Sequence, residues 1–206
     1  MSQIAEARED PIDGLAAVPA HVRRAGFTVW FTGLSGAGKT TVAALVGREL
    51  ESLGRPVEHL DGDVVRTHLS RGLGFSREDR DLNVDRIAWV ASRLTRHGAA
   101  VLVSAISPYE AARRRARQRV EQFGAFIEVF VNASLDTCSA RDVKGLYAKA
   151  LAGHIPSFTG VTDPYEPPTK PDLVLATEHE LPEDSAASVL GRLFDLGLVD
   201  PEGERR

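Results

Sequence analysis

A glycine-rich turn followed by a lysine and a threonine is the strongest chemical signal in the sequence. Residues 33–40 read Gly-Leu-Ser-Gly-Ala-Gly-Lys-Thr and fit the pattern G-x-x-x-x-G-K-[ST]. Glycines let the backbone curl so that successive N–H groups point at a β-phosphate, and the start of the next helix adds partial positive charge. Lys39 would then reach the β- and γ-phosphates, and the Thr40 hydroxyl would ligate Mg2+. The segment therefore predicts a site for a nucleoside triphosphate with Mg2+.

Two carboxylates and an arginine follow the next apolar segment. Asp61 and Asp63 come directly after residues 57–60, and Arg66 lies three residues further on. If that segment is a strand, these side chains lie at the carboxyl end of the sheet, where ligands bind. Phosphoryl transfer needs a carboxylate to orient the attacking hydroxyl or to hold Mg2+ through water, and a cation to bind an anionic acceptor. The three residues could supply both, and a turn with solvated charges is the alternative.

A polar stretch after residue 74 offers further ligand contacts. Phe75 could stack on a base, and Arg80 and Asn83, one helical turn apart, could hold phosphate and base or ribose. An arginine and a phenylalanine in such a stretch are as often surface charge and minor core. The residue types alone leave both interpretations open.

A phosphate-binding loop serves GTPase switches, motors and small-molecule kinases, so the rest of the chain must decide between them. A guanine-reading Asn-Lys-x-Asp follows a strand, whereas residues 169–172, Thr-Lys-Pro-Asp, precede one in a proline-rich loop. Residues 153–171 form a long loop of the kind that often serves as a lid. A short domain with a lid favours transfer of the γ-phosphate to a bound small molecule, with water excluded.

The segments around these residues alternate between apolar strands and helices. We expect strands at 27–31, 57–60, 99–105, 126–131 and 173–176. We expect helices at 39–53, 84–96, 108–122, 134–140, 144–152 and 183–196. Ser107 and Pro108 are typical of a helix start, with the hydroxyl as the cap. The alternation predicts an α/β class, a three-layer α/β/α P-loop NTPase fold with a parallel five-stranded sheet.

Length and composition fit one compact domain. The chain has 206 residues, of which 43% are hydrophobic and 26% charged, which excludes collagen-like, coiled-coil and wholly disordered classes. We expect a flexible arm at 1–24, the P-loop kinase domain at 25–199 with a lid at about 141–171, and a polar tail at 200–206.

Charge and hydropathy exclude several partners. The net charge is −4, and the five arginines between 113 and 119 spread around a helix without interleaved aromatic residues, so we expect no nucleic-acid partner. No apolar run approaches the roughly 20 residues that span a bilayer, and the first residues lack the character of a signal peptide. With a single cysteine, Cys138, the sequence predicts a cytoplasmic protein without a membrane partner.

Metal ligands are also sparse. The six histidines show no spacing typical of a metal site. The sequence therefore predicts no metal beyond nucleotide-bound Mg2+.

Several blocks along the chain resemble the adenylyl-sulfate kinase family of the P-loop kinase superfamily. The resemblance runs from about residue 26 to 195 and rests on residues 33–41, 60–66, 74–76, Arg80 with Asn83, 106–109, 141–147, 158–160 and 163–166. It implies transfer of the ATP γ-phosphate to the 3'-hydroxyl of adenosine 5'-phosphosulfate, giving 3'-phosphoadenosine 5'-phosphosulfate, the activated sulfate donor.

The resemblance also implies roles for individual residues. ATP would be bound by Gly33, Leu34, Ser35, Gly36, Ala37, Gly38, Lys39, Thr40, Thr41 and Arg141. The acceptor would be bound by Asp63, Arg66, Phe75, Arg80, Asn83, Ile106, Ser107, Lys144, Leu146 and Phe158. Lys39, Asp61 and Ser107 would be catalytic, and Thr40 and Asp61 would face Mg2+. Phe75 and Phe158 would sandwich the adenine of the acceptor, and Arg66 and Arg80 would meet its phosphosulfate.

Ser107 has two interpretations. It occupies a position described as phosphorylated in some family members, but direct in-line transfer needs no covalent intermediate, so we assign it to positioning first. The alternative is a helix cap before Pro108. Departures from the family pattern are Leu82, Asp85 and Glu110, and the first two border Asn83 and so bear on acceptor affinity.

The family resemblance suggests a homodimer and a functional association with sulfate adenylyltransferase. Two other functions stay open at this stage. One is a P-loop kinase for another small hydroxyl acceptor. The other is a non-catalytic ATP-sensing partner of a sulfate-activating enzyme.

Overall fold

Five parallel strands form the sheet at the centre of the molecule. The computed structural model describes residues 25–142, 145–155 and 157–201. The strands are β1 (Phe27–Thr32), β2 (Val57–Asp61), β3 (Ala100–Ser104), β4 (Ala125–Val131) and β5 (Leu173–Leu175). They lie in the order β2-β3-β1-β4-β5, and every neighbouring pair is parallel. β1 is therefore the central strand.

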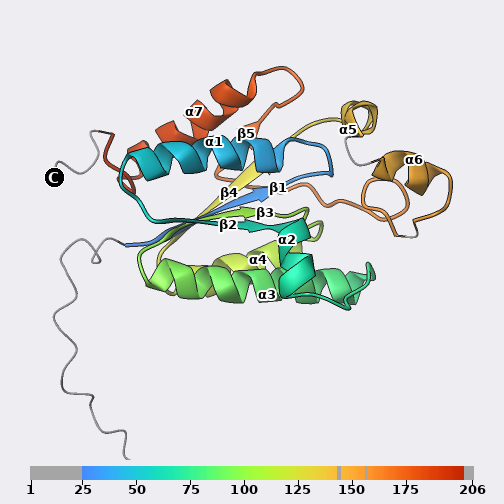
Figure 1. The fold of residues 1–206 in the computed structure, drawn as a ribbon, viewed down its shortest axis with the longest axis horizontal. Helices are drawn as coiled ribbons and strands as arrows, with labels where there is room; N and C mark the ends of the chain where they lie inside the picture. The colour runs from blue at the N-terminus through green and yellow to red at the C-terminus, as the bar shows by residue number, and fades with distance from the viewer. Residues whose placement is uncertain (1–24, 143–144, 156, 202–206) are drawn as a thin grey trace, which may run out of the picture.

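Helices cover both faces of this sheet. They are α1 (Lys39–Ser52), α2 (Gly62–His68), α3 (Arg77–Arg96), α4 (Glu110–Val120), α5 (Leu135–Arg141), α6 (Leu146–Leu151) and α7 (Pro182–Asp195). Figure 1 shows α1 and α7 on one face and α3 and α4 on the other, with α5 and α6 beyond one end of the sheet. The three-layer α/β/α fold with a parallel five-stranded sheet is thus confirmed.

The side chains of β1 alternate between two apolar clusters. Phe27, Val29 and Phe31 are fully buried in the cluster that includes α1 and α7. Trp30 is fully buried in the opposite cluster, with residues of α3 and α4. A strand that is buried on both faces reads as a nearly continuous apolar run, which is why β1 was visible in the sequence.

Two helical segments were not predicted. α2 begins at Gly62, where the Asp61 carboxylate accepts the backbone N–H of Asp63 as an N-cap. α3 begins at Arg77 rather than at residue 84, because the Ser76 hydroxyl caps it by accepting the N–H of Asp79. Both segments are rich in charge, so they carry no apolar period that would reveal a helix.

The prediction that Ser107 caps α4 is wrong. The N-cap residue is Tyr109, and no side chain caps this helix. Ser107 instead has a φ of 42°, and its hydroxyl accepts the indole N–H of Trp30 and donates to the carbonyl of Ala105. The serine therefore belongs to the loop that leaves β3, not to the helix.

Three of the five arginines in α4, Arg113, Arg115 and Arg117, make contacts with other elements, as the sequence predicted for a few of them. Arg113 is buried and Arg117 is half-buried, whereas Arg114 and Arg119 are exposed.

Over the described residues, no helix is both long and apolar enough to cross a membrane. The predicted arm at 1–24 lies outside the described residues, and the predicted tail at 200–206 is described only at residues 200–201.

The backbone around Gly124, the residue before β4, is tightly packed. A Cβ added there would lie 2.1 Å from the carbonyl oxygen of Gly26 and 2.6 Å from Cγ2 of Thr95. Because backbone must move to relieve this clash, we expect Gly124→Ala to lower the free energy of unfolding by about 1–3 kcal/mol. Urea unfolding followed by circular dichroism measures the change.

Gly191 in α7 supplies the matched control for this experiment. A Cβ there meets no atom within 4 Å, so Gly191→Ala should raise the free energy of unfolding by about 0.5–1 kcal/mol through its helix propensity. Equal effects of the two alanines would contradict the packing described here.

Candidate active site

The phosphate-binding loop lies between the central strand and α1. Gly36 and Gly38 have φ angles of 77° and 104°, which residues with a Cβ rarely adopt. Gly38 is also the N-cap of α1, and no side chain caps that helix. The first backbone N–H groups of α1 are thus left to an anionic ligand, as the sequence predicted for a phosphate site.

Lys39 lies against this loop. Its ammonium donates hydrogen bonds to the carbonyls of Gly33 at 3.0 Å and Leu34 at 2.7 Å. The side chain is only 8% exposed, so its charge is held close to the loop. Thr40 and Thr41 follow on the exposed first turn of α1.

Thr40 and Asp61 are in direct contact. The Thr40 hydroxyl donates to Oδ2 of Asp61 at 2.7 Å, while Oδ1 of Asp61 accepts the backbone N–H of Asp63 at 2.9 Å. The structure therefore joins the residue after the loop lysine to the carboxylate at the end of β2. A hydroxyl and a carboxylate side by side are oxygen donors of the kind that Mg2+ takes near nucleotide phosphates, so the residues fit this ion.

Two arginines face one aromatic ring on the α2 and α3 side. The guanidinium carbons of Arg66 and Arg80 lie 4.5 and 5.5 Å from the ring centroid of Phe75, whose side chain is 49% exposed. Burial lowers the pKa of both guanidiniums, and the charge of Arg80 lowers the pKa of Arg66 further. Two cations held together at a cost in charge repulsion are typical of a site for an anion.

Arg80 is the centre of this group. Its guanidinium donates to the carbonyls of Phe75 and Ser157 and lies 3.6 Å from the Asp163 carboxylate. That carboxylate accepts the hydroxyl of Tyr109 at 2.8 Å, and burial, followed by this hydrogen bond, raises the pKa of Tyr109 to about 12. The arginine thus connects α3 to the loop that precedes β5.

The two phenylalanines predicted to sandwich a base have different surroundings. Phe75 is half-exposed beside the arginines, whereas Phe158 is buried and packs edge-on against Tyr147 at 5.0 Å. Arg80 donates to the backbone of Phe75 and to that of Ser157, the residue before Phe158. The guanidinium therefore links the segments that carry both rings.

Three further predicted acceptor residues, Asn83, Ile106 and Leu146, lie on different elements. Asn83 lies on α3, is 7% exposed, and its Oδ1 has no hydrogen-bond partner within the described part of the chain. Ile106 follows β3 and its carbonyl accepts the Thr32 hydroxyl at 2.7 Å. Leu146 begins α6 and packs against the core, and Lys144 lies outside the described residues. A buried, unpartnered amide oxygen is the feature expected of a ligand contact.

α5 and α6 pack against the phosphate-binding loop. Arg141 of α5 donates to the carbonyl of Gly36 at 3.3 Å and to that of Thr177 at 2.7 Å. The Thr177 hydroxyl donates to the carbonyl of Ala37, and the Tyr147 hydroxyl to that of Ser35. The predicted cationic residue Arg141 is therefore beside the phosphate-binding loop.

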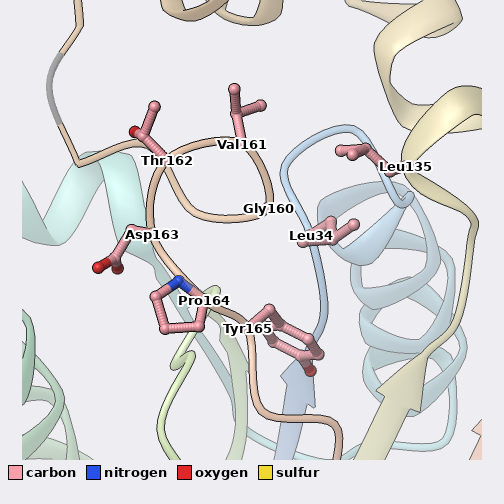
Figure 2. Close-up of a pocket in the computed structure, with 8 residues that line it drawn as sticks. All are labelled: Leu34, Leu135, Gly160, Val161, Thr162, Asp163, Pro164 and Tyr165. Atoms are coloured by element: carbon pink, nitrogen blue, oxygen red, sulfur yellow. The ribbon is translucent and has the colours of Figure 1, made fainter.

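A cavity of about 550 Å³ lies between the phosphate-binding loop and the loop before β5. It is lined by Leu34, Leu135, Gly160, Val161, Thr162, Asp163, Pro164 and Tyr165. Figure 2 shows Leu34 and Tyr165 on one side of this space and Asp163 on the other. The Tyr165 hydroxyl shares a hydrogen bond with Thr32 at 2.9 Å, so the cavity wall is anchored at the end of β1.

Sequence reasoning gave no role to five residues that shape the site. Tyr109, Tyr147, Asp163 and Tyr165 all lie within the blocks that carry the family resemblance, and that membership was the signal available for them. Thr177 lies outside those blocks and had no signal, because a lone threonine after a short strand is unremarkable in sequence.

The departures from the family pattern lie at the surface of α3 and α4. Leu82 is 43% exposed, and Asp85 pairs with Arg115 at 3.3 Å. The backbone N–H of Glu110 donates to Glu166. None of these three residues has a contact with Arg66, Arg80 or Asn83 among the interactions described.

Comparison with known proteins gives concordant results. The family model described as adenylylsulphate kinase matches residues 25–176. The adenylyl-sulfate kinase of Synechococcus sp. (strain JA-3-3Ab) is 63% identical over 85% of this chain and 98% of its own.

Solved structures are also similar. The APS kinase CysC of Mycobacterium tuberculosis, in complex with AMPPNP and APS, has a TM-score of 0.81 at 45% identity, over 83% of this chain and 99% of that chain. A hexameric APS kinase from Thiobacillus denitrificans has a TM-score of 0.67 at 36% identity, over 88% of this chain and 31% of that chain. The chain that carries this phosphate-binding loop and this arginine pair belongs to the adenylylsulphate kinase family.

Proposed function

We propose that this chain transfers the γ-phosphate of ATP to the 3'-hydroxyl of adenosine 5'-phosphosulfate. The observation that carries the proposal is the pairing of Arg66 with Arg80 around Phe75, at the same edge of the sheet as the phosphate-binding loop. Two cations beside an exposed aromatic ring suit a ligand with two adjacent anionic groups and a base. The name and bound ligands of the M. tuberculosis relative support the same acceptor.

ATP would bind over the loop and the start of α1. The uncapped N–H groups of α1 would donate to its phosphates, and Lys39, now bonded to two loop carbonyls, would turn its ammonium to the β- and γ-phosphates. Arg141 would lie beside the nucleotide, where its charge stabilises the transferred phosphoryl group. When bound, Mg2+ would neutralise charge on the β- and γ-phosphate oxygens, and Thr40 and Asp61 would hold it.

The acceptor would bind between α2, α3 and the loop before β5. Arg66 and Arg80 would receive its phosphosulfate, and Phe75 and Phe158 would face its adenine. Asn83 would accept a hydrogen bond from the base or ribose with its Oδ1, which lacks a partner among the described residues. Asp63, Ile106, Leu146 and Lys144 complete the proposed set, with Lys144 outside the described residues.

The reaction would be a direct in-line displacement. The 3'-oxygen would attack the γ-phosphorus as the bond to the β,γ-bridging oxygen breaks and ADP leaves, and the Asp61 carboxylate would accept the proton of the attacking hydroxyl. Ser107 would act by position, since the residue is only 3% exposed and its hydroxyl is already bonded to Trp30 and Ala105. No covalent intermediate is needed.

The proposal extends to the surroundings of the enzyme. We propose a homodimer acting in the cytoplasm, in functional association with sulfate adenylyltransferase and with residues 141–171 as a lid over the bound substrates. A hexameric relative supports association between copies of this kind of domain. The contacts of Arg141 and Tyr147 with the phosphate-binding loop support the lid.

Acceptor choice tests the proposed reaction. ADP release from Mg-ATP is measured with adenosine 5'-phosphosulfate, AMP, shikimate or gluconate, and with Lys39→Ala as the control enzyme. We expect turnover with the phosphosulfate alone and a loss of about 100-fold or more in Lys39→Ala. Turnover with another acceptor would contradict the proposed substrate, and none with any acceptor would favour an ATP sensor.

Arg80 and Arg141 should separate the two substrates. Arg80→Ala is expected to raise the KM for the phosphosulfate about 10-fold or more, with the KM for ATP little changed, because charge-assisted contacts to the acceptor are lost. Arg141→Ala should raise the KM for ATP, with the KM for the phosphosulfate little changed.

Steady-state kinetics with one substrate varied at a time measures both effects. Arg119→Ala, in the exposed last turn of α4, is the control for removal of a charge. An equal rise in the KM for both substrates in Arg80→Ala would contradict the assignment of Arg80 to the acceptor.

Asp61→Asn isolates the charge of the carboxylate. Asparagine is as good an N-cap as aspartate, so α2 should keep its start. We expect kcat to fall by about 100-fold or more while the phosphosulfate still binds, because the attacking hydroxyl loses its charged acceptor. Stopped-flow kinetics and calorimetric binding measure the two parts, and a kcat within about threefold of the wild type would be the contrary result.

A further inference from the structure

One arginine of α4 is buried beneath the proposed acceptor site. Arg113 is 2% exposed, and its Nε donates to Oε1 of Glu128 on β4 at 2.8 Å. A buried guanidinium needs both a counter-charge and partners for its other N–H groups. Glu128 supplies the counter-charge, so the remaining N–H groups of Arg113 can donate to neighbouring loops.

Those donors reach two backbone carbonyls from different parts of the chain. One terminal nitrogen donates to the carbonyl of Ser107 at 2.7 Å, and the other donates to the carbonyl of Glu166, also at 2.7 Å. The fork of a guanidinium can hold both at once, whereas a single ammonium nitrogen cannot. Arg113 therefore fixes the loop that leaves β3 against the loop that precedes β5.

The first of these loops has an unfavourable backbone conformation. The φ of Ser107 is 42°, in the left-handed region that residues with a Cβ rarely adopt. Its carbonyl is held by Arg113 and its hydroxyl by the indole N–H of Trp30, at 2.9 Å. The surrounding contacts, and not local preference, keep this residue in place.

The second loop forms the wall of the cavity. Glu166 follows Asp163, Pro164 and Tyr165, which line the cavity, and Asp163 faces Arg80. The backbone N–H of Glu166 donates to the carbonyl of Pro108 at 2.8 Å, so the two loops also touch directly. A shift at Glu166 would be passed to Asp163 within three residues.

We propose that Arg113 is a positioning residue for the acceptor site: by holding the carbonyls of Ser107 and Glu166 it sets the geometry that binds the phosphosulfate. This inference rests on the proposed function. Arg113 has no described contact with the phosphate-binding loop or with Arg141. Its effect should therefore fall on the acceptor and spare ATP.

Arg117 offers a matched control on the same helix, one turn further on. It pairs with Glu128 at 3.7 Å and with Asp172 at 2.6 Å, and donates to the carbonyl of Phe126. Like Arg113, Arg117 therefore pairs with a carboxylate and donates to a backbone carbonyl, but none of its partners belongs to the acceptor site. A purely structural role would give the same kinetic result at both positions.

The test compares Arg113→Lys with Arg117→Lys. Lysine keeps the charge beside Glu128 but loses the fork, so we expect Arg113→Lys to raise the KM for the phosphosulfate about 10-fold, with the KM for ATP within about twofold. Arg117→Lys should leave both KM values within about twofold. Thermal unfolding of both variants shows how much stability each has lost.

Trp30→Phe is measured beside them, so that the comparison survives if Arg113→Lys does not fold. It removes the N–H donor to Ser107 while keeping an aromatic ring in the core, and it should also raise the acceptor KM. An unchanged KM for the phosphosulfate in Arg113→Lys and Trp30→Phe, where these variants fold, overturns the inference. A rise of equal size in Arg117→Lys also overturns it. Absence of turnover in the wild type would instead overturn the proposed function.

Discussion

Parallel pairing of β1 with β3 on one side and β4 on the other is the constraint from which the site follows. Because all five strands run the same way, the loops after them meet at one edge of the sheet. The loop after β1 leads to Lys39 at the start of α1, the end of β2 carries Asp61, and the loop after β3 carries Ser107. The fully buried faces of β1 fix this strand, and so fix the position of the phosphate-binding loop relative to the acceptor residues.

The edge holds two groups of cations that would serve two anionic ligands. Lys39 and Arg141 are bonded to carbonyls of the phosphate-binding loop, while Arg66 and Arg80 are bonded to carbonyls around Phe75. The contacts with carbonyls orient these side chains without cancelling their charge, although Arg80 also lies 3.6 Å from the carboxylate of Asp163. Below them, Glu128 balances the charge of Arg113, whose remaining hydrogen bonds reach the loops of the acceptor side. A purely ionic pairing at each arginine would leave less charge for a substrate.

Local chemistry made part of this predictable from the sequence. Left-handed glycines, a loop lysine and the apolar run of β1 are features of single segments. The parallel five-stranded sheet, the phosphate-binding loop and the place of Asp61 at the end of a strand were therefore confirmed. The helix α2 was missed because its short sequence shows no apolar period. The alternative that Ser107 caps a helix is wrong because Trp30 and Ala105 hold its hydroxyl. Arg113 differs from its neighbour Arg114 in being buried, and the spacing of residues in the sequence does not reveal this difference.

The central claim is that the Asp61 carboxylate lies between the nucleotide and the anion site formed by Arg66 and Arg80. A crystal structure of this chain with a non-hydrolysable ATP analogue and adenosine 5'-phosphosulfate measures that arrangement. We expect the 3'-oxygen within about 3 Å of the Asp61 carboxylate and the phosphosulfate against both arginines. A phosphosulfate bound away from the arginines, or a 3'-oxygen beyond the reach of Asp61 even through one water, would contradict it.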